Sequence, residues 1–122
     1  MAEKERILYV LTSGPDTPER LYAPFILATA AKKMDTDATI FFMIKGILVV
    51  RKGVAETIKL GNMPYLSEFV RQAKEEGVEF IVCEQSTQIL GLSKGDYIEG
   101  CKFGGPITLN DLMLSSKSTL VL

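Results

Sequence analysis

Four short apolar stretches are separated by segments of helical character, and this alternation constrains the fold more than any other feature of the sequence. The stretches are RILYVLT (Arg6–Thr12), ATIFFMI (Ala38–Ile44), VEFIVC (Val78–Cys83) and STLVL (Ser118–Leu122). Continuous apolar runs of this length are typical of strands that are covered on both faces. Strands that alternate with helices form a mainly parallel sheet with helices on both sides. The sequence therefore predicts a three-layer α/β/α sandwich, and its 122 residues fit one domain, residues 1–122.

The first helix has clear start signals. Thr17 provides a hydroxyl cap, Pro18 occupies the first helical position, and Glu19 places an acid near the positive end of the helix dipole. We expect this helix to reach about Met34. Because Pro24 cannot donate to the helical hydrogen-bond ladder, we also expect a kink or a restart near Tyr22.

The other connections differ in how clearly they can be interpreted. The best-defined helix runs from Pro64 to about Glu76, because its apolar residues recur at helical spacing and Gly77 follows as a left-handed cap. The stretch KGILVVRKG (45–53) fits a buried strand or a short helix, and we favour the helix. AETIKLGNM (55–63) indicates an irregular, exposed connection. The remaining predicted helices are Gln85 to about Leu90 and, after the Gly104-Gly105 turn, Pro106 to about Ser115.

Charge and patterning exclude several classes of function. The chain has 14 basic and 15 acidic residues and a net charge of -1, so it has no strong field for nucleic acid or anionic lipid. Its apolar runs are too short to cross a bilayer, and its start does not resemble a signal peptide, so we expect a soluble, cytoplasmic protein. Neither a Walker A pattern nor a G-x-G-x-x-G pattern is present, and we therefore expect no phosphate-bearing cofactor.

The absence of histidine leaves cysteine as the main candidate for chemistry. Without histidine there is no Ser-His-Asp triad, no Cys-His dyad and no imidazole shuttle. The two cysteines are too few for a disulfide framework, and they lack the histidine partners of a zinc site, so no metal is expected. What remains is chemistry of thiols, carboxylates, lysines or the backbone.

Cys83 lies at the predicted carboxyl end of a strand, where parallel α/β proteins place ligands and catalytic groups. A helix beginning near Gln85 or Ser86 would favour its thiolate, whereas the neighbouring Glu84 would oppose it. Unpaired cysteine is also often buried as a small apolar residue. Position alone leaves both interpretations open for Cys83.

The other candidates have weaker arguments. Cys101 lies among turn residues, and a loop or edge position is favoured over a role as a redox partner. Lys45 follows a predicted strand and could face a sulfur anion, although such lysines are normally solvated. Ser86 could donate to a thiolate or simply cap the short helix.

With Cys83 placed at a strand end, the stretch GVEFIVCEQSTQILGLSKGDYIEGCKFGGPITLNDL resembles the DsrE/DsrF-like sulfur-relay family, in particular its branch labelled predicted peroxiredoxins. The residues that carry the resemblance are a strand-ending cysteine, a serine three residues later, a Gly-Leu pair and a later glycine turn. Here these are Cys83, Ser86, Gly91 with Leu92, and Gly104 with Gly105. The segments PFILATAAKKM, IFF and KGILVVRKG extend the resemblance to nearly the whole chain.

The resemblance implies a mainly parallel sheet of about five strands, and homo-oligomers that are commonly trimers or hexamers. It also implies that Cys83 accepts sulfane sulfur as a persulfide and passes it to a cysteine of a partner protein. Cys101 stands where the branch usually has an aliphatic residue, so the resemblance does not imply a two-cysteine redox cycle.

The residue pattern and the resemblance together leave three candidate functions. The first is a sulfur carrier or sulfurtransferase that works through Cys83. The second is a non-catalytic oligomeric binding module in which Cys83 is inert. The third is a thiol peroxidase, which is less expected because no arginine lies close in sequence to Cys83.

Overall fold

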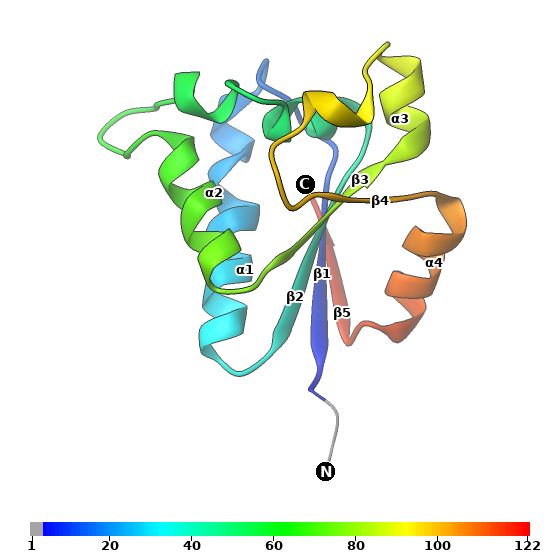
Figure 1. Cartoon of the computed structure of the whole chain (residues 1–122). Helices are drawn as coiled ribbons and strands as arrows, with labels where there is room; N and C mark the ends of the chain where they lie inside the picture. Colours follow the sequence, from blue (N-terminus) through cyan, green and yellow to red (C-terminus); the bar gives the residue numbers. More distant parts are fainter. Residues whose placement is uncertain (1–3) are drawn as a thin grey trace.

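The apolar runs of the sequence form the strands of a parallel sheet. The computed structural model describes residues 4–122, and within this range the sheet has five strands in the order β4-β3-β2-β1-β5, all of them parallel. The strands are β1 (Arg6–Leu11), β2 (Asp37–Phe42), β3 (Glu79–Cys83), β4 (Lys102–Gly104) and β5 (Ser118–Val121). The strands are parallel, so their carboxyl ends lie on the same side of the sheet, and β1, β2 and β3 run upward in Figure 1.

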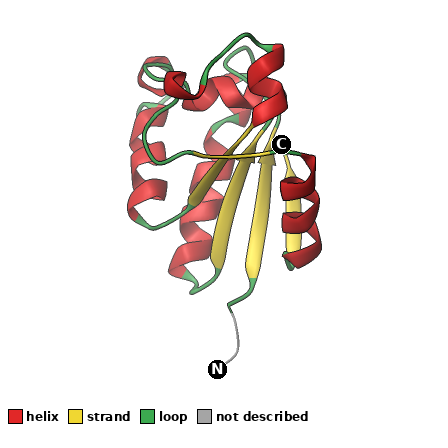
Figure 2. Ribbon diagram, turned by 45° about the vertical axis from the view of Figure 1, so that its right-hand side comes forward, coloured by secondary structure: helices red, strands yellow, loops and turns green. Residues whose placement is uncertain are grey.

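Helices cover both faces of this sheet, which confirms the predicted α/β/α architecture (Figures 1 and 2). Helices α1 and α2 lie on one face, α4 lies on the other, and α3 stands beyond the carboxyl end of β3. The α-helices are α1 (Tyr22–Lys33), α2 (Leu66–Glu75), α3 (Glu84–Ile89) and α4 (Pro106–Ser115). Four 3-10 helices are found in the described part of the chain: η1 (Pro18–Arg20), η2 (Ile44–Val50), η3 (Ala55–Thr57) and η4 (Lys94–Asp96).

The first helical region is interrupted where proline predicts it. The short η1 ends at Arg20, and α1 begins at Tyr22. Pro24 therefore lies in the first turn of α1, where its missing N–H removes no helical hydrogen bond. The predicted restart near Tyr22 is confirmed.

Two connections differ from the sequence prediction. The segment expected to be an exposed, irregular connection contains η3 and buries Ala55 and Ile58 against the core. Strand β4 was not predicted, because it has three residues, lies among turn residues and has only Gly104 buried. Short edge strands of this kind are specified by pairing with a neighbour rather than by their own sequence.

Side chains of the strands alternate between two unequal cores. Phe80 and Val82 of β3 pack on the α1–α2 side in a large cluster, where Phe80 lies against Phe25 with ring centres 5.8 Å apart. Ile81 and Cys83 point to the opposite face, in a small cluster that Leu112 of α4 covers. Cys83 is thus placed on the more thinly covered face of the sheet.

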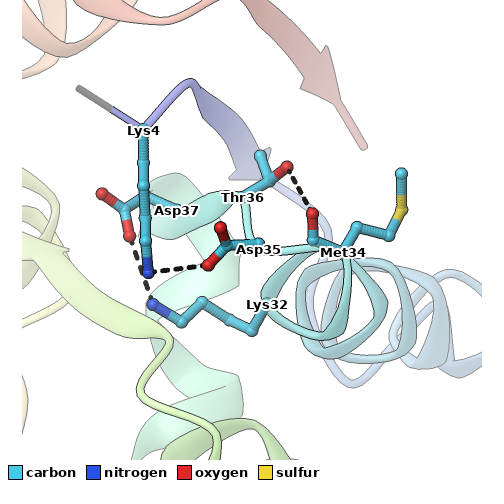
Figure 3. Close-up of polar contacts among 6 residues, drawn as sticks. All are labelled: Lys4, Lys32, Met34, Asp35, Thr36 and Asp37. Atoms are coloured by element: carbon cyan, nitrogen blue, oxygen red, sulfur yellow. Dashed lines mark hydrogen bonds and ion pairs between the residues drawn. The ribbon is translucent and has the colours of Figure 1, made fainter. Parts of the chain in front are cut away.

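The amino end of the sheet is closed by ion pairs (Figure 3). Lys4 pairs with Asp35 at 3.0 Å, and Lys32 pairs with Asp37 at 3.2 Å. Asp35 has a left-handed backbone, with φ of 59°, at the turn between α1 and β2. Ion pairs that are reached by solvent contribute little to stability. They fix the turn at the end of the sheet opposite Cys83.

Within residues 4–122, no helix has both the length and the apolar character required to cross a bilayer.

Candidate functional site

Cys83 occupies the junction where β3 passes directly into α3. Its backbone is extended, with φ of -69° and ψ of 122°, and it is the N-cap residue of α3. The backbone N–H of Ser86 donates to Cys83 Sγ at 3.4 Å. Cysteine therefore takes the capping position that an oxygen side chain usually fills, and its sulfur lies against an N–H of the first helical turn.

The thiol lies at a pocket of about 190 Å³ between the ends of β2 and β3 and the start of α4. Only 7% of Cys83 is exposed. The lining residues are Phe41, Met43, Cys83, Gln85, Gly105, Pro106, Leu109 and Asn110. This lining is mainly apolar, its two polar side chains are amides, and no charged side chain occurs among the described residues that form it.

Ser86 links the two segments that frame this pocket. Its buried hydroxyl accepts a hydrogen bond from the backbone N–H of Ile44 at 2.8 Å. Ile44 has φ of 57°, a left-handed conformation that is uncommon for a β-branched residue. The group that donates to Cys83 is therefore the backbone N–H of Ser86, while its hydroxyl holds the turn after β2.

A second polar contact fixes the backbone of Cys83. The hydroxyl of Thr87 donates to the Cys83 carbonyl at 2.9 Å and lies 2.7 Å from the hydroxyl of Tyr97. Because Thr87 has already used its one proton, Tyr97 donates in the second contact. Burial raises the pKa of Tyr97, which keeps this donor protonated. Sequence reasoning missed Tyr97, since no periodicity marks it in a loop.

The glycines of the predicted site have distinct roles. Gly104 lies beside Cys83 in the β3–β4 register, and a Cβ there would approach Thr108 Cγ2 to 2.7 Å. Gly105 lines the Cys83 pocket, and its N–H donates to Thr108 Oγ1 at 3.3 Å. Gly91, with φ of 71°, ends α3 outside the pocket lining. Gly104 and Gly105 are thus brought to Cys83, whereas Gly91 terminates the following helix.

Lys45, the cation that the sequence offers as a partner for a sulfur anion, lies outside the lining of the Cys83 pocket. Lys45 is exposed and pairs with Asp16 at 2.9 Å, so it is not part of the pocket lining. Lys94 lies 4.0 Å from Glu84 and 5.0 Å from the ring centre of Phe103, in a separate pocket of about 210 Å³. The structure therefore does not bring Lys45 together with Cys83.

Cys101 is separated from Cys83 by the sheet. Both thiols are free, and Cys101 packs against the large cluster rather than the small one. Gly104, not Cys101, is the register partner of Cys83, and three residues of extended chain span roughly 10 Å. A disulfide needs Cα atoms within about 7 Å. Burial raises the pKa of the Cys101 thiol to about 11, which opposes its reaction at neutral pH.

No group of three His, Cys, Asp or Glu side chains within residues 4–122 could hold an ion.

Comparison with known proteins identifies the family of the chain. The model of the DsrE/DsrF-like family matches residues 5–122. The chain belongs to the DsrE/DsrF-like family. Among its relatives is the uncharacterized protein MJ0760 of Methanocaldococcus jannaschii, 33% identical over 109 residues, which are 88% of this chain but 40% of that protein. The uncharacterized protein MK0008 of Methanopyrus kandleri is 28% identical over 107 residues, 88% of this chain and 83% of that protein.

Solved structures of the same fold extend the comparison. The YchN protein of E. coli superposes with a TM-score of 0.79 at 20% identity, covering 98% of this chain and 100% of that one. Protein MTH1491 of Methanobacterium thermoautotrophicum, of unknown function, gives a TM-score of 0.70 at 13% identity, with coverage of 98% and 100%. These likenesses confirm the fold.

Proposed function

We propose that this protein is a cytoplasmic sulfur carrier or sulfurtransferase that holds sulfane sulfur as a persulfide on Cys83 and passes it to a thiol of a partner protein. The observation that carries the proposal is the position of Cys83, which lines a pocket and whose Sγ accepts the Ser86 N–H. The broad association of the DsrE/DsrF-like family with sulfur relay supports it.

The chemistry requires a thiolate and access rather than a general base. The Cys83 thiolate attacks the sulfane sulfur of a donor, an S–S bond forms, and the donor group departs with the electron pair of the bond that breaks. A thiolate of the acceptor protein then attacks the terminal sulfur, and Cys83 leaves as the thiolate. The N–H of Ser86 is placed to stabilise negative charge on Cys83 before and after each transfer.

Intact-mass spectrometry tests the proposal directly. The protein is incubated with a sulfane-sulfur donor in a Cys101→Ser background, so that a gain of sulfur reports on Cys83. We expect sulfur to be added to this variant, lost to a reductant, and transferred to an added acceptor thiol. No gain of sulfur, or an equal gain in a Cys83→Ser chain that retains Cys101, would contradict the proposal.

The burial of Cys83 favours a second candidate, an oligomeric binding module with an inert thiol. Its side chain packs with Phe41, Ile81 and Leu112 and is 7% exposed. Under this alternative, a small neutral thiol reagent labels native Cys83 at neutral pH far more slowly than the unfolded chain. Under the sulfur-carrier proposal, the reagent enters the pocket and labels Cys83 before global unfolding occurs.

We also propose that the protein forms a homo-oligomer, a trimer or hexamer, and exchanges sulfur with donor and acceptor proteins. The support for self-association is an apolar surface on the outer side of α4 and on β5. Ile107 is 85% exposed and Leu114 is 88% exposed on α4, and Val121 is 60% exposed on β5. Apolar residues gathered on adjoining elements mark a surface that another protein covers.

A further inference from the structure

The lining of the Cys83 pocket contains no charged side chain among the described residues. The residues around the thiol are apolar side chains from β2 and α4 together with the amides of Gln85 and Asn110. Among the described lining residues there is no cation. The nearest charge in sequence is the carboxylate of Glu84, which is exposed and directed to the neighbouring pocket with Lys94.

An anionic donor meets two electrostatic costs at this pocket. It leaves water for an apolar lining that offers no ion pair, and its charge approaches a nucleophile that is itself negative. An uncharged donor avoids both costs and gains from burial against Phe41, Met43 and Leu109. Lys45, the residue that sequence alone offered as an anion partner, is paired with Asp16 outside the pocket.

We propose that the sulfur donor for Cys83 is an uncharged polysulfide, a neutral chain or ring of sulfur, rather than an anion such as thiosulfate. This inference rests on the proposed sulfur-carrier function. The Cys83 thiolate attacks one sulfur of the donor, and the bond from that sulfur to its neighbour breaks. The neighbour takes the electron pair and becomes a thiolate, which departs from a linear donor or stays at the end of the chain from an opened ring. No oxidant or reductant is consumed.

Matched disulfides test the charge preference separately from sulfur transfer. In a Cys101→Ala background, the rate of mixed-disulfide formation at Cys83 is measured with neutral hydroxyethyl disulfide and with the dianion dithiodiglycolate. Each rate is divided by that of mercaptoethanol at the same pH, so that the intrinsic reactivity of the reagent cancels. We expect the normalised rate to be at least about tenfold higher for the neutral reagent, because the apolar lining excludes unpaired charge. Equal rates, or a faster dianion, would overturn the inference.

A second test adds a positive charge at the pocket and compares it with the same charge placed on a distant loop. Asn110→Lys places a cation at the pocket on an exposed position of α4, whereas Asn62→Lys adds the same charge on an exposed loop before α2. We expect Asn110→Lys to raise the rate with the dianion several-fold, to leave the neutral reagent nearly unchanged, and to exceed any effect of Asn62→Lys. Equal effects of the two lysines would show that the pocket is not the cause.

The two proposals fail in different ways. If Cys83 prefers neutral disulfides but takes no sulfur from any sulfane donor, the sulfur-carrier function is wrong. If it accepts sulfur from thiosulfate as readily as from dissolved elemental sulfur, both normalised to mercaptoethanol, the function stands and the inference about the donor is wrong.

Discussion

Ser86 connects the Cys83 thiol to a strained turn through two different atoms. Its N–H donates to Cys83 Sγ, and its hydroxyl accepts the N–H of Ile44, whose φ is 57°. Replacing Ser86 by alanine keeps the first contact and removes the second. It therefore leaves the partly buried N–H of Ile44 without its partner, in a conformation that costs energy to hold.

For Ser86→Ala we expect the free energy of unfolding to fall by about 0.5–1.5 kcal/mol, the usual net contribution of one hydrogen bond. Chemical denaturation measures this change. Thr57→Ala is a suitable control, because it removes an exposed hydroxyl that bonds only to the Val54 carbonyl, 2.7 Å away. If Ser86→Ala lowers the free energy of unfolding no more than the control does, the turn after β2 does not depend on the Ser86 hydroxyl.

The second cysteine gives a prediction for the dependence of stability on pH. Burial raises the pKa of the Cys101 thiol to about 11, although nearby Lys74 lowers it. An unfolded cysteine has a pKa of about 8.5. Below about pH 8.5 the Cys101 thiol is protonated in both the folded and the unfolded chain. Between about pH 8.5 and about pH 11, the unfolded chain loses the thiol proton that the folded chain keeps. Stability therefore falls as pH rises through this window.

We expect the wild type to lose about 1–2 kcal/mol relative to Cys101→Ser over this window, since Cys101 is only partly buried. The measurement is the free energy of unfolding of both proteins at several pH values under reducing conditions. Tyr97 has a raised pKa as well, but it is present in both proteins and cancels. If the free energy of unfolding depends on pH in the same way in both proteins, the raised pKa of the Cys101 thiol is contradicted.

At the level of elements, the turn from β2 into η2 depends on one glycine. Gly46 is buried, and a Cβ at this position would lie 2.0 Å from the carbonyl oxygen of Leu11 at the end of β1. This oxygen also accepts the N–H of Met43 at 3.0 Å. The approach of η2 to β1 is therefore limited by backbone atoms that cannot move independently.

Gly46→Ala should destabilise the protein by about 2 kcal/mol or more, because the added methyl group must displace η2 from the sheet. Thermal and urea unfolding measure the loss. Gly95→Ala is the matched control, since a Cβ there meets no described atom within 4 Å and the backbone is not left-handed. We expect the control to change stability by no more than about 0.5 kcal/mol. Similar losses of stability in Gly46→Ala and Gly95→Ala would contradict the conclusion that contact with the Leu11 carbonyl limits the approach of η2 to β1.

The elements differ in how far the sequence predicts them. Strands β1, β2 and β3 follow from apolar runs whose burial is a local property of the sequence. Strand β4 depends on pairing with β3, and Gly46 depends on contact with β1, so neither has a local signal. In the candidate site, strand-end position predicted Cys83, and Ser86 was predicted as a donor to a thiolate or a cap of the short helix. The pairing of Lys45 with Asp16 and of Thr87 with Tyr97 joins distant segments, which sequence spacing does not show.

At the scale of the whole molecule, the two faces of the sheet are covered unequally. Helices α1 and α2 bury a large core on one face, whereas α4 is the one α-helix on the other face in the part of the chain that the structure describes (Figure 2). Within α4, Leu112 points inward and is buried, while Ile107 and Leu114 face outward. Strand β5 beside it is exposed along its length. In the proposed oligomer, a second copy of the chain buries this surface.

Leu114→Glu should therefore weaken self-association. In the proposed oligomer, each symmetric contact loses the burial of a leucine, about 1.5–3 kcal/mol, and gains the cost of desolvating a carboxylate. Light scattering coupled to size exclusion measures the mass of the wild type and of the variant at the same concentration. Ile89→Glu is the matched control, because Ile89 is 80% exposed on α3, against 88% for Leu114. We expect the wild type and the Ile89 variant to be oligomers and the Leu114 variant to shift toward the monomer. A monomeric wild type, or an equal shift in both variants, would rule out the α4–β5 surface as the contact between copies.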